Sequence, residues 1–318
     1  MKKSYAFGLT GLAMLSIAGC NLGGGGSTNP SANYTAVGTP LPGVATSQQI
    51  AYDSTTNQIW TLISDNSITK LCHILANATG SQGWTCSTVA GISIDNNFIT
   101  SNGVNTLYFL STTASPFQDN IVSYNTSTGE VATTSSSTVS TSTYFLPYAR
   151  NRVAYYNSLL YSTVGTNLFG FTPAAGGSPT STLSGINSAL SAGQTIDPTT
   201  GNMYGFSFNH STPYALFQNV NNNSQSGTFG AALPSQNGST DTFYDMVVAN
   251  NNVYACGSGN VYSLPTSANS TSQWNVLGPT STSGNMTAGC TSITSGAGQL
   301  FMFGTVSSGP QQLYKMAI

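Results

Sequence analysis

The sequence predicts an all-β fold made of repeated four-stranded units, and three observations predict it. Short apolar runs, often alternating with polar residues, are separated by clusters of Asn, Gly, Ser, Thr and Pro, and no long segment after the first 26 residues has a helical period. A pair of one apolar and one aromatic residue recurs six times along the chain. The last copy of the unit ends before a fourth apolar run, and such a run stands ahead of the first copy.

The recurring pair sets the length of the unit. Its aromatic members are 48, 53, 43, 50 and 47 residues apart, with one apolar run before each pair, a third run after it and in most units a weaker fourth. Four short strands every 40 to 50 residues or so are typical of a β-propeller blade, which buries its faces only against its neighbours. The pairs are Ile59–Trp60, Leu107–Tyr108, Leu160–Tyr161, Met203–Tyr204, Val253–Tyr254 and Leu300–Phe301.

The two ends of this region predict how the ring closes. The last unit stops at Ile318 after its third run, and residues 34–38 resemble the fourth run at 274–278. We therefore expect one β-propeller of six four-stranded blades over 34–318, closed by an N-terminal strand, with the recurring aromatic residues packed between blades. Two packed β-sandwiches are the alternative, against which the regular spacing argues. No motif identifies a particular propeller family.

The first residues predict export. Lys2 and Lys3 precede an uncharged, mostly apolar stretch at 5–18. A membrane-spanning helix needs roughly 20 residues, so this stretch is too short to span. A positive start followed by a short apolar segment and small residues is typical of a secretory signal peptide.

The cysteine that follows this segment indicates an anchor. Ile17-Ala18-Gly19-Cys20 resembles the lipobox of bacterial lipoproteins. The resemblance implies a signal peptide at 1–19, a diacylglycerol on the Cys20 thiol and a lipidated Gly/Ser-rich tether at 20–33; several acyl chains anchor a protein stably. Asn21 stands where an aspartate would resemble an inner-membrane retention signal, so we expect the outer membrane, on its periplasmic or its surface face. A secreted protein with a chance cysteine is the alternative.

Composition excludes one class of partner. Only 4% of the residues are charged, whereas aromatic residues reach 10%, so the chain should fold with a surface of hydroxyls and amides. Nucleic-acid binding needs a basic patch that neutralises several phosphates. No such patch can be built from the basic residues left after cleavage, which are Lys70, Arg150, Arg152 and Lys315.

The four cysteines after Cys20 predict disulfides. Their number is even, an exported protein meets an oxidising compartment, and no CxxC spacing suggests zinc. Cys72 and Cys86 fall in a third and a fourth run around a turn centred near residue 79, so a symmetric hairpin would place them opposite each other. Cys256 and Cys290 fall where a second strand ends and the next unit begins, which in a propeller share one rim. We expect Cys72–Cys86 and Cys256–Cys290, and neither a metal nor a cofactor.

Residue types that carry catalysis are sparse, and no catalytic residue is assigned. His73 and His210 have no nucleophile motif beside them. Asp53 and Asp197 begin equivalent turns, where a carboxylate accepts hydrogen bonds from the backbone just ahead, and that local role explains them.

One polar set falls near the start of the first strand of several units, which in a propeller lines the central channel. Either these residues pair with one another and stabilise the channel mouth, or they form a polar pocket for a small ligand, a glycan or a metal, of which a metal is the least favoured because no calcium-loop pattern is present. The set comprises Gln48, Asp95, Arg150, Arg152, Gln194 and Asp245.

Two functions remain open from the sequence. The first is a non-catalytic binding or scaffold propeller for a protein or glycan on the outer membrane. The second is a secreted hydrolase or lyase with a sparse active site at the channel mouth. So few titratable residues favour binding, although the fold alone cannot decide.

Overall fold

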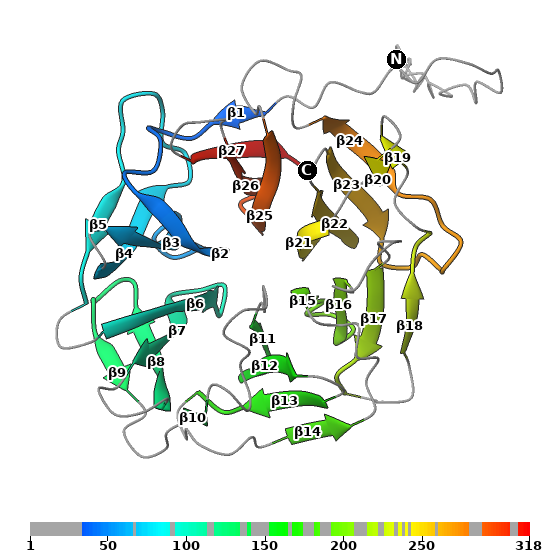
Figure 1. The fold of residues 1–318 in the computed structure, drawn as a ribbon, viewed down its shortest axis with the longest axis horizontal. Helices are drawn as coiled ribbons and strands as arrows, with labels where there is room; N and C mark the ends of the chain where they lie inside the picture. Colours follow the sequence, from blue (N-terminus) through cyan, green and yellow to red (C-terminus); the bar gives the residue numbers. More distant parts are fainter. Residues whose placement is uncertain are drawn as a thin grey trace, which may run out of the picture.

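The computed structural model shows an all-β propeller arrangement, in which small sheets follow one another around a central space (Figure 1). It describes residues 34–65, 68–89, 93–112, 118–133, 139–140, 153–164, 167–173, 181–184, 192–206, 215–221, 226–231, 235–236, 239–240, 243–257, 260–279, 288–305 and 311–318. These residues contain strands, turns and bends but no helix, and none of them forms a helix able to cross a membrane. Cys20 and the predicted signal peptide and tether lie outside them.

Five sheets have four strands each, and in each the strands pair antiparallel with their neighbours. The first sheet holds β2 (Val44–Asp53), β3 (Gln58–Asp65), β4 (Ile68–Leu75) and β5 (Thr85–Ser87). Another holds β11 (Ala154–Tyr156), β12 (Leu159–Val164), β13 (Asn167–Phe171) and β14 (Ser181–Ser184). The next holds β15 (Ala192–Ile196), β16 (Asn202–Phe206), β17 (Ala215–Asn219) and β18 (Ser226–Phe229).

The remaining two four-stranded sheets lie near the C-terminus. One holds β21 (Phe243–Ala249), β22 (Asn252–Gly257), β23 (Asn260–Pro265) and β24 (Asn275–Pro279). The other joins β25 (Ala288–Gly296), β26 (Gln299–Thr305) and β27 (Gln312–Ala317) to β1 (Thr35–Ala36). A two-stranded hairpin of β19 (Ser235–Gln236) and β20 (Ser239–Thr240) precedes β21.

The prediction of six four-stranded blades is corrected to five four-stranded blades. The sheet that follows β5 has five strands, namely β6 (Ser93–Ser101), β7 (Thr106–Thr112), β8 (Gln118–Asn125), β9 (Val131–Thr133) and β10 (Val139–Ser140). β9 pairs with residues 122–124 of β8 and β10 with residues 118–119. Two short strands thus share the edge of β8 that a single fourth strand covers elsewhere.

The N-terminal strand closes the last sheet, as the sequence predicts. Thr35 pairs with Lys315 and Ala36 with Tyr314, and the Val37 amide donates to the Leu313 carbonyl over 2.8 Å. The Gln312 side-chain amide donates to the Val37 carbonyl over 3.2 Å. The first and last strands of the described chain, β1 and β27, are therefore hydrogen-bonded neighbours in one sheet, which Figure 1 shows beside the labelled C-terminus.

The core lies between sheets, and the recurring pairs build it. Each cluster of buried residues joins two successive sheets; for example Trp60 of β3 packs in the same cluster as Phe109 of β7. Ile59 shares a cluster with Phe301, which joins the last sheet to the first. The six recurring aromatic side chains are all 8% exposed or less, so their predicted core role is confirmed. Because neighbours bury these faces for each other, closure of the ring protects all of them at once.

Local turn chemistry fits the tight connections between first and second strands. The Asp53 carboxylate accepts hydrogen bonds from the Thr55 amide and the Thr56 hydroxyl, and that of Asp197 accepts from the Thr199 amide and the Thr200 hydroxyl. This confirms the predicted local role of both aspartates. The two-residue turn Asn250–Asn251 has positive φ at both residues, the conformation that matches the twist of a β-hairpin and that asparagine tolerates.

Both predicted disulfides are present. Cys72 and Cys86 are direct partners across β4 and β5, with Cα atoms 4.1 Å apart. Cys256 of β22 is bonded to Cys290 of β25, with Cα atoms 5.3 Å apart. The first bridge lies inside one sheet, and the second joins two neighbouring sheets.

Candidate functional site

One position repeats around the centre of the ring. In every four-stranded sheet and in the five-stranded one, the strand nearest the centre pairs with the strand that carries the recurring aromatic residue (Figure 1). The residue opposite that aromatic therefore occupies an equivalent place in each sheet. These residues are Ala51, Thr100, Ala154, Thr195, Val247 and Thr294.

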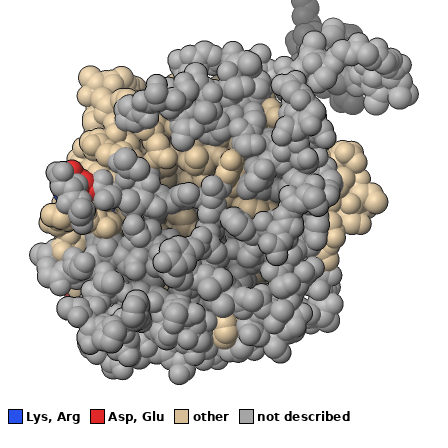
Figure 2. Space-filling view, viewed as in Figure 1, with Lys and Arg blue, Asp and Glu red and all other residues tan. Residues whose placement is uncertain are grey.

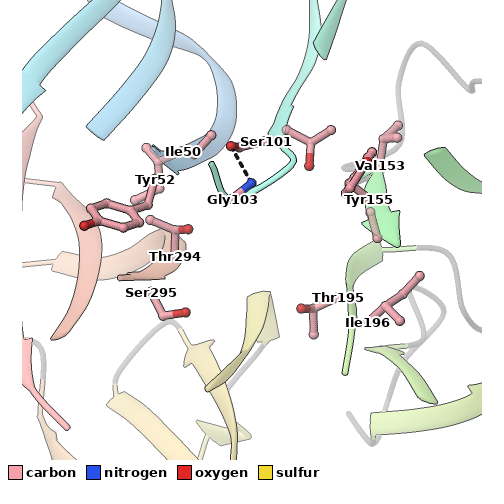
Figure 3. Close-up of a pocket in the computed structure, with 13 residues that line it drawn as sticks. Ile50, Tyr52, Ser101, Gly103, Val153, Tyr155, Thr195, Ile196, Thr294 and Ser295 are labelled. Atoms are coloured by element: carbon pink, nitrogen blue, oxygen red, sulfur yellow. Dashed lines mark hydrogen bonds between the residues drawn. The ribbon is translucent and has the colours of Figure 1, made fainter. Parts of the chain in front are cut away.

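A cavity of about 240 Å³ lies at this level. Its walls come from the C-terminal parts of β2, β6, β15 and β25 and from β11 with Val153, and Gly103 adds a loop position (Figure 3). Five separate sheets thus meet at one small space. The lining consists of residues 50–52, 100–101, 103, 153–155, 195–196 and 294–295.

Hydroxyl groups form the polar part of this wall. In Figure 3 the side chains of Thr195 and Ser295 point toward each other across the space. The Thr195 hydroxyl accepts a hydrogen bond from the Val248 amide over 3.3 Å, and the Ser101 hydroxyl accepts one from the Gly103 amide over 2.9 Å. A hydroxyl offers one donor and two acceptor positions, so each keeps a donor available after these contacts.

Two tyrosines line opposite sides of the cavity, and in Figure 3 the ring of Tyr52 points away from the central space. The Tyr52 ring stacks on Phe301 with centroids 6.0 Å apart, and its hydroxyl donates to the Asn57 side-chain oxygen over 3.1 Å. A Cβ at Gly296 would overlap this ring, so the glycine makes room for it. Tyr155 stacks on Tyr108 with centroids 5.4 Å apart. Packing therefore fixes both rings before any ligand arrives.

Burial raises the pKa of two tyrosines at or beside this wall, Tyr52 and Tyr108. Burial, followed by the charge of nearby Asp53, raises the pKa of Tyr52. Burial, then the neighbouring Tyr155 and a hydrogen bond with it, raises the pKa of Tyr108 to about 12. A phenol in such a place is a hydrogen-bonding group at neutral pH rather than a base.

The described lining carries no Asp, Glu, His, Lys or Arg. Among the atoms that Figure 2 draws as described on one face of the molecule, nearly all belong to uncharged residues. Lys70 and Asp65, at the ends of the β3–β4 hairpin, pair with each other over 2.6 Å. No cluster of three potential metal ligands occurs in the described ranges. The described part of the cavity wall is therefore uncharged.

The sequence places its candidate residues nearer the other end of the innermost strands. Gln48 and Asp95 fall in irregular stretches of β2 and β6, between Ala45 and Ile50 and between Ile94 and Ile99. Gln194 falls in a similar stretch of β15. A bulge re-aims side chains locally. Arg150 and Arg152 lie outside the described residues. A ligand role for this set stays a prediction.

Asp245, the last member of the set, ties two sheets together. It is 3% exposed, and its carboxylate accepts hydrogen bonds from the Met246 amide, the Ser292 hydroxyl and the Ile293 amide over 2.9, 3.2 and 2.8 Å. Gln49 does the same in the first sheet, where its side-chain oxygen accepts from the Ile99 amide over 3.2 Å. Both residues stand two positions before the one opposite the recurring aromatic.

The sequence did not predict the cavity, because the predicted site residues are charged or carry amides, whereas the polar side chains of the cavity wall carry hydroxyls. The register shows that Gln49, and not Gln48, is equivalent to Asp245. The hydroxyls at 100, 195 and 294 occupy one repeated position, but they stand 8, 9 and 7 residues before their aromatic partners, so aligning the units on the aromatic alone does not superpose them. His73, which has no nucleophile motif beside it in the sequence, packs against Trp60 with ring centroids 4.4 Å apart, and burial lowers its pKa.

Comparisons with known proteins show the fold and nothing finer. No family model matches the chain, and no curated protein matches it. A putative oxidoreductase (glucose dehydrogenase) from Thermus thermophilus has a TM-score of 0.53 at 11% identity, over 90% of this chain and 100% of that one. A luciferin-regenerating enzyme has a TM-score of 0.52 at 9% identity, over 89% and 92%. Similarity at this identity concerns the fold, because unrelated functions share propellers.

Proposed function

We propose that the chain is a lipoprotein of the bacterial outer membrane whose propeller is a non-catalytic binding or scaffold module for a protein or glycan. The observation that carries the proposal is the central cavity, whose described lining offers hydroxyl and aromatic groups but no carboxylate or imidazole. Such a wall can hold a ligand, whereas general acid–base catalysis most often uses a histidine or a carboxylate within reach of the substrate.

The five-stranded sheet fits this proposal as a sixth blade of the ring. β9 and β10 together would serve as its fourth strand. Its clusters support this, because Phe109 packs with the sheet before it and Ile121 with the sheet after it.

The anchor rests on the sequence. Ile17-Ala18-Gly19-Cys20 supplies the cleavage and lipidation site in the proposal. Two disulfides support an exported protein, since such bonds persist in oxidising compartments. The tether at 20–33 would then join the lipid to the propeller.

The polar set at the start of the innermost strands stays part of the proposal as a second place for a ligand. Its members Asp95 and Arg152 are tested together: the double variant Asp95→Asn, Arg152→Gln should lose binding of the natural ligand and keep the melting temperature. Unchanged binding would remove this set from the proposal.

The hydrolase or lyase alternative draws on one observation, namely that two proteins of similar fold are described as enzymes. That similarity does not carry an activity. A hydrolase or lyase also needs an acid or a base at the bond that breaks, and the described cavity wall offers no carboxylate, imidazole or amine for that role, only the two tyrosine hydroxyls. Binding is therefore the function that we propose.

Growth of a bacterium expressing the full chain with labelled palmitate tests the anchor. The wild-type protein should carry the label and sediment with outer membranes. Cys20→Ser should lose the label and accumulate as uncut precursor, while Cys72→Ser with Cys86→Ser should keep the label. Label on Cys20→Ser would contradict the anchor.

A further inference from the structure

The cavity wall combines three kinds of group that together define a ligand class. Hydroxyls at Thr195 and Ser295 face each other, Tyr155 and apolar Val153 stand on one side of the space, and Tyr52 lines the other side with its ring turned outward (Figure 3). Hydroxyl groups donate and accept at once, so they complement a ligand that itself carries many hydroxyls. Aromatic rings add an apolar surface for its C–H faces.

The absence of charged side chains in the described wall narrows the ligand class further. The described wall has no group that could neutralise a phosphate, a carboxylate or an ammonium. A buried charge without a partner is strongly unfavourable, so a charged analogue of the same size should bind less well than the neutral one. The fixed ring of Tyr155 lowers the ordering cost of binding, because little conformational freedom is left to lose.

Size sets the scale of the ligand. Small-molecule sites commonly have volumes of about 300–1,000 Å³, and the volume of about 240 Å³ lies just below that range. A space of this kind suits one sugar ring or a compact polyol rather than a polymer. A glycan would then enter with a terminal residue.

We propose that the central cavity between the C-terminal parts of β2, β6, β11, β15 and β25 binds a neutral sugar residue through the hydroxyls of Thr195 and Ser295 and through Tyr155. This inference rests on the proposed binding function and names its ligand class. It concerns hydroxyl and aromatic residues that are not members of the polar set that contains Asp95.

The test titrates the full-length protein, in a detergent without a sugar head group, with neutral hexoses and N-acetylhexosamines by calorimetry. At least one should bind, with an affinity that does not change with salt, because no ion pair contributes. Thr195→Val with Ser295→Ala should weaken it about tenfold, since two hydrogen bonds to the ligand are lost. Ser87→Ala, which removes an exposed hydroxyl from the outermost strand β5, should leave the affinity unchanged.

Two substitutions of Tyr155 distinguish a contribution of its ring from a contribution of its hydroxyl to ligand binding. Tyr155→Phe keeps the ring and should change the affinity by less than about threefold, whereas Tyr155→Leu should weaken it about tenfold. Melting temperatures identify a variant that fails through loss of folding; Ser295→Ala, the smallest change, then carries the test alone with an expected loss of about threefold.

Three results would overturn the inference: no neutral sugar binds, the double variant binds as the wild type does, or glucuronate or glucosamine binds more tightly than its neutral parent. The proposed function would survive any of these if intact glycan or protein is still captured by the double variant. Loss of capture by the wild type itself would instead remove the proposed function.

Discussion

Single side chains join the innermost strands to one another at this propeller's centre. The Asp245 carboxylate reaches from β21 to the Ile293 amide of β25, and the Gln49 amide oxygen reaches from β2 to the Ile99 amide of β6. Each accepts from the N–H group of a residue that lies directly after, or one position after, a register shift in the neighbouring sheet. A buried donor without an acceptor is costly, so these side chains stabilise the bulged register.

Removing the Asp245 carboxylate should therefore destabilise the fold. Asp245→Ala leaves two amides and the Ser292 hydroxyl without this acceptor and should lower the free energy of unfolding by about 3 kcal/mol. Asp245→Asn keeps one acceptor oxygen and should lose less. Urea unfolding at pH 7 measures both. Asp65→Ala, which removes an exposed ion pair with Lys70, is the control and should change the free energy by less than about 1 kcal/mol; an equal loss in both variants would contradict the assigned role.

The repeated sheets were largely predictable from the sequence, whereas split strands and β-bulges within them were not. The period of the recurring pair predicts the repeated unit, because core packing demands an aromatic residue at one place in each sheet. Cysteine spacing around a symmetric hairpin predicts Cys72 opposite Cys86. The split of a fourth strand into β9 and β10 had no signal, since their short segments carry few apolar residues. The one-residue offset between Gln48 and Gln49 depends on a bulge, which the alternation pattern does not show.

The disulfide between two sheets should stabilise the fold more than the disulfide within one sheet. Cys256–Cys290 closes 34 residues between two sheets, and Cys72–Cys86 closes 14 within one. Chain entropy gives about 3.8 and about 3.0 kcal/mol for loops of these lengths. Replacing each pair by serine and measuring chemical unfolding should show the larger loss for the 256–290 pair. A larger loss for the 72–86 pair would contradict this order.

The whole ring depends on burying the recurring tyrosines. Burial is the largest cause that raises the pKa of Tyr108, Tyr161, Tyr204 and Tyr254 above the ordinary 10.0, to about 12 for Tyr108. Above the ordinary value an unfolded tyrosine loses its proton while the folded one keeps it. The folded chain then binds more protons than the unfolded chain, so the free energy of unfolding falls as the pH rises.

Alkaline unfolding checks this account of the core. The tyrosine contribution should be fully present below about pH 10 and should be lost as the pH rises through the folded values. Denaturant titrations from about pH 8 to about pH 11 measure the slope, and Tyr108→Phe should make it shallower. A slope unchanged by Tyr108→Phe would contradict a burial effect at this position.

Capture of a glycan without chemical change tests the central claim, a propeller that binds rather than reacts. The full-length protein is incubated with a library of neutral and charged surface glycans, washed, and its bound fraction is analysed by mass spectrometry. We predict retention of a glycan that ends in a neutral sugar, recovered with its mass unchanged, and reduced retention by Thr195→Val with Ser295→Ala. Shortened fragments that have gained water, or fragments that end in a new double bond, would contradict the account by showing a hydrolase or a lyase.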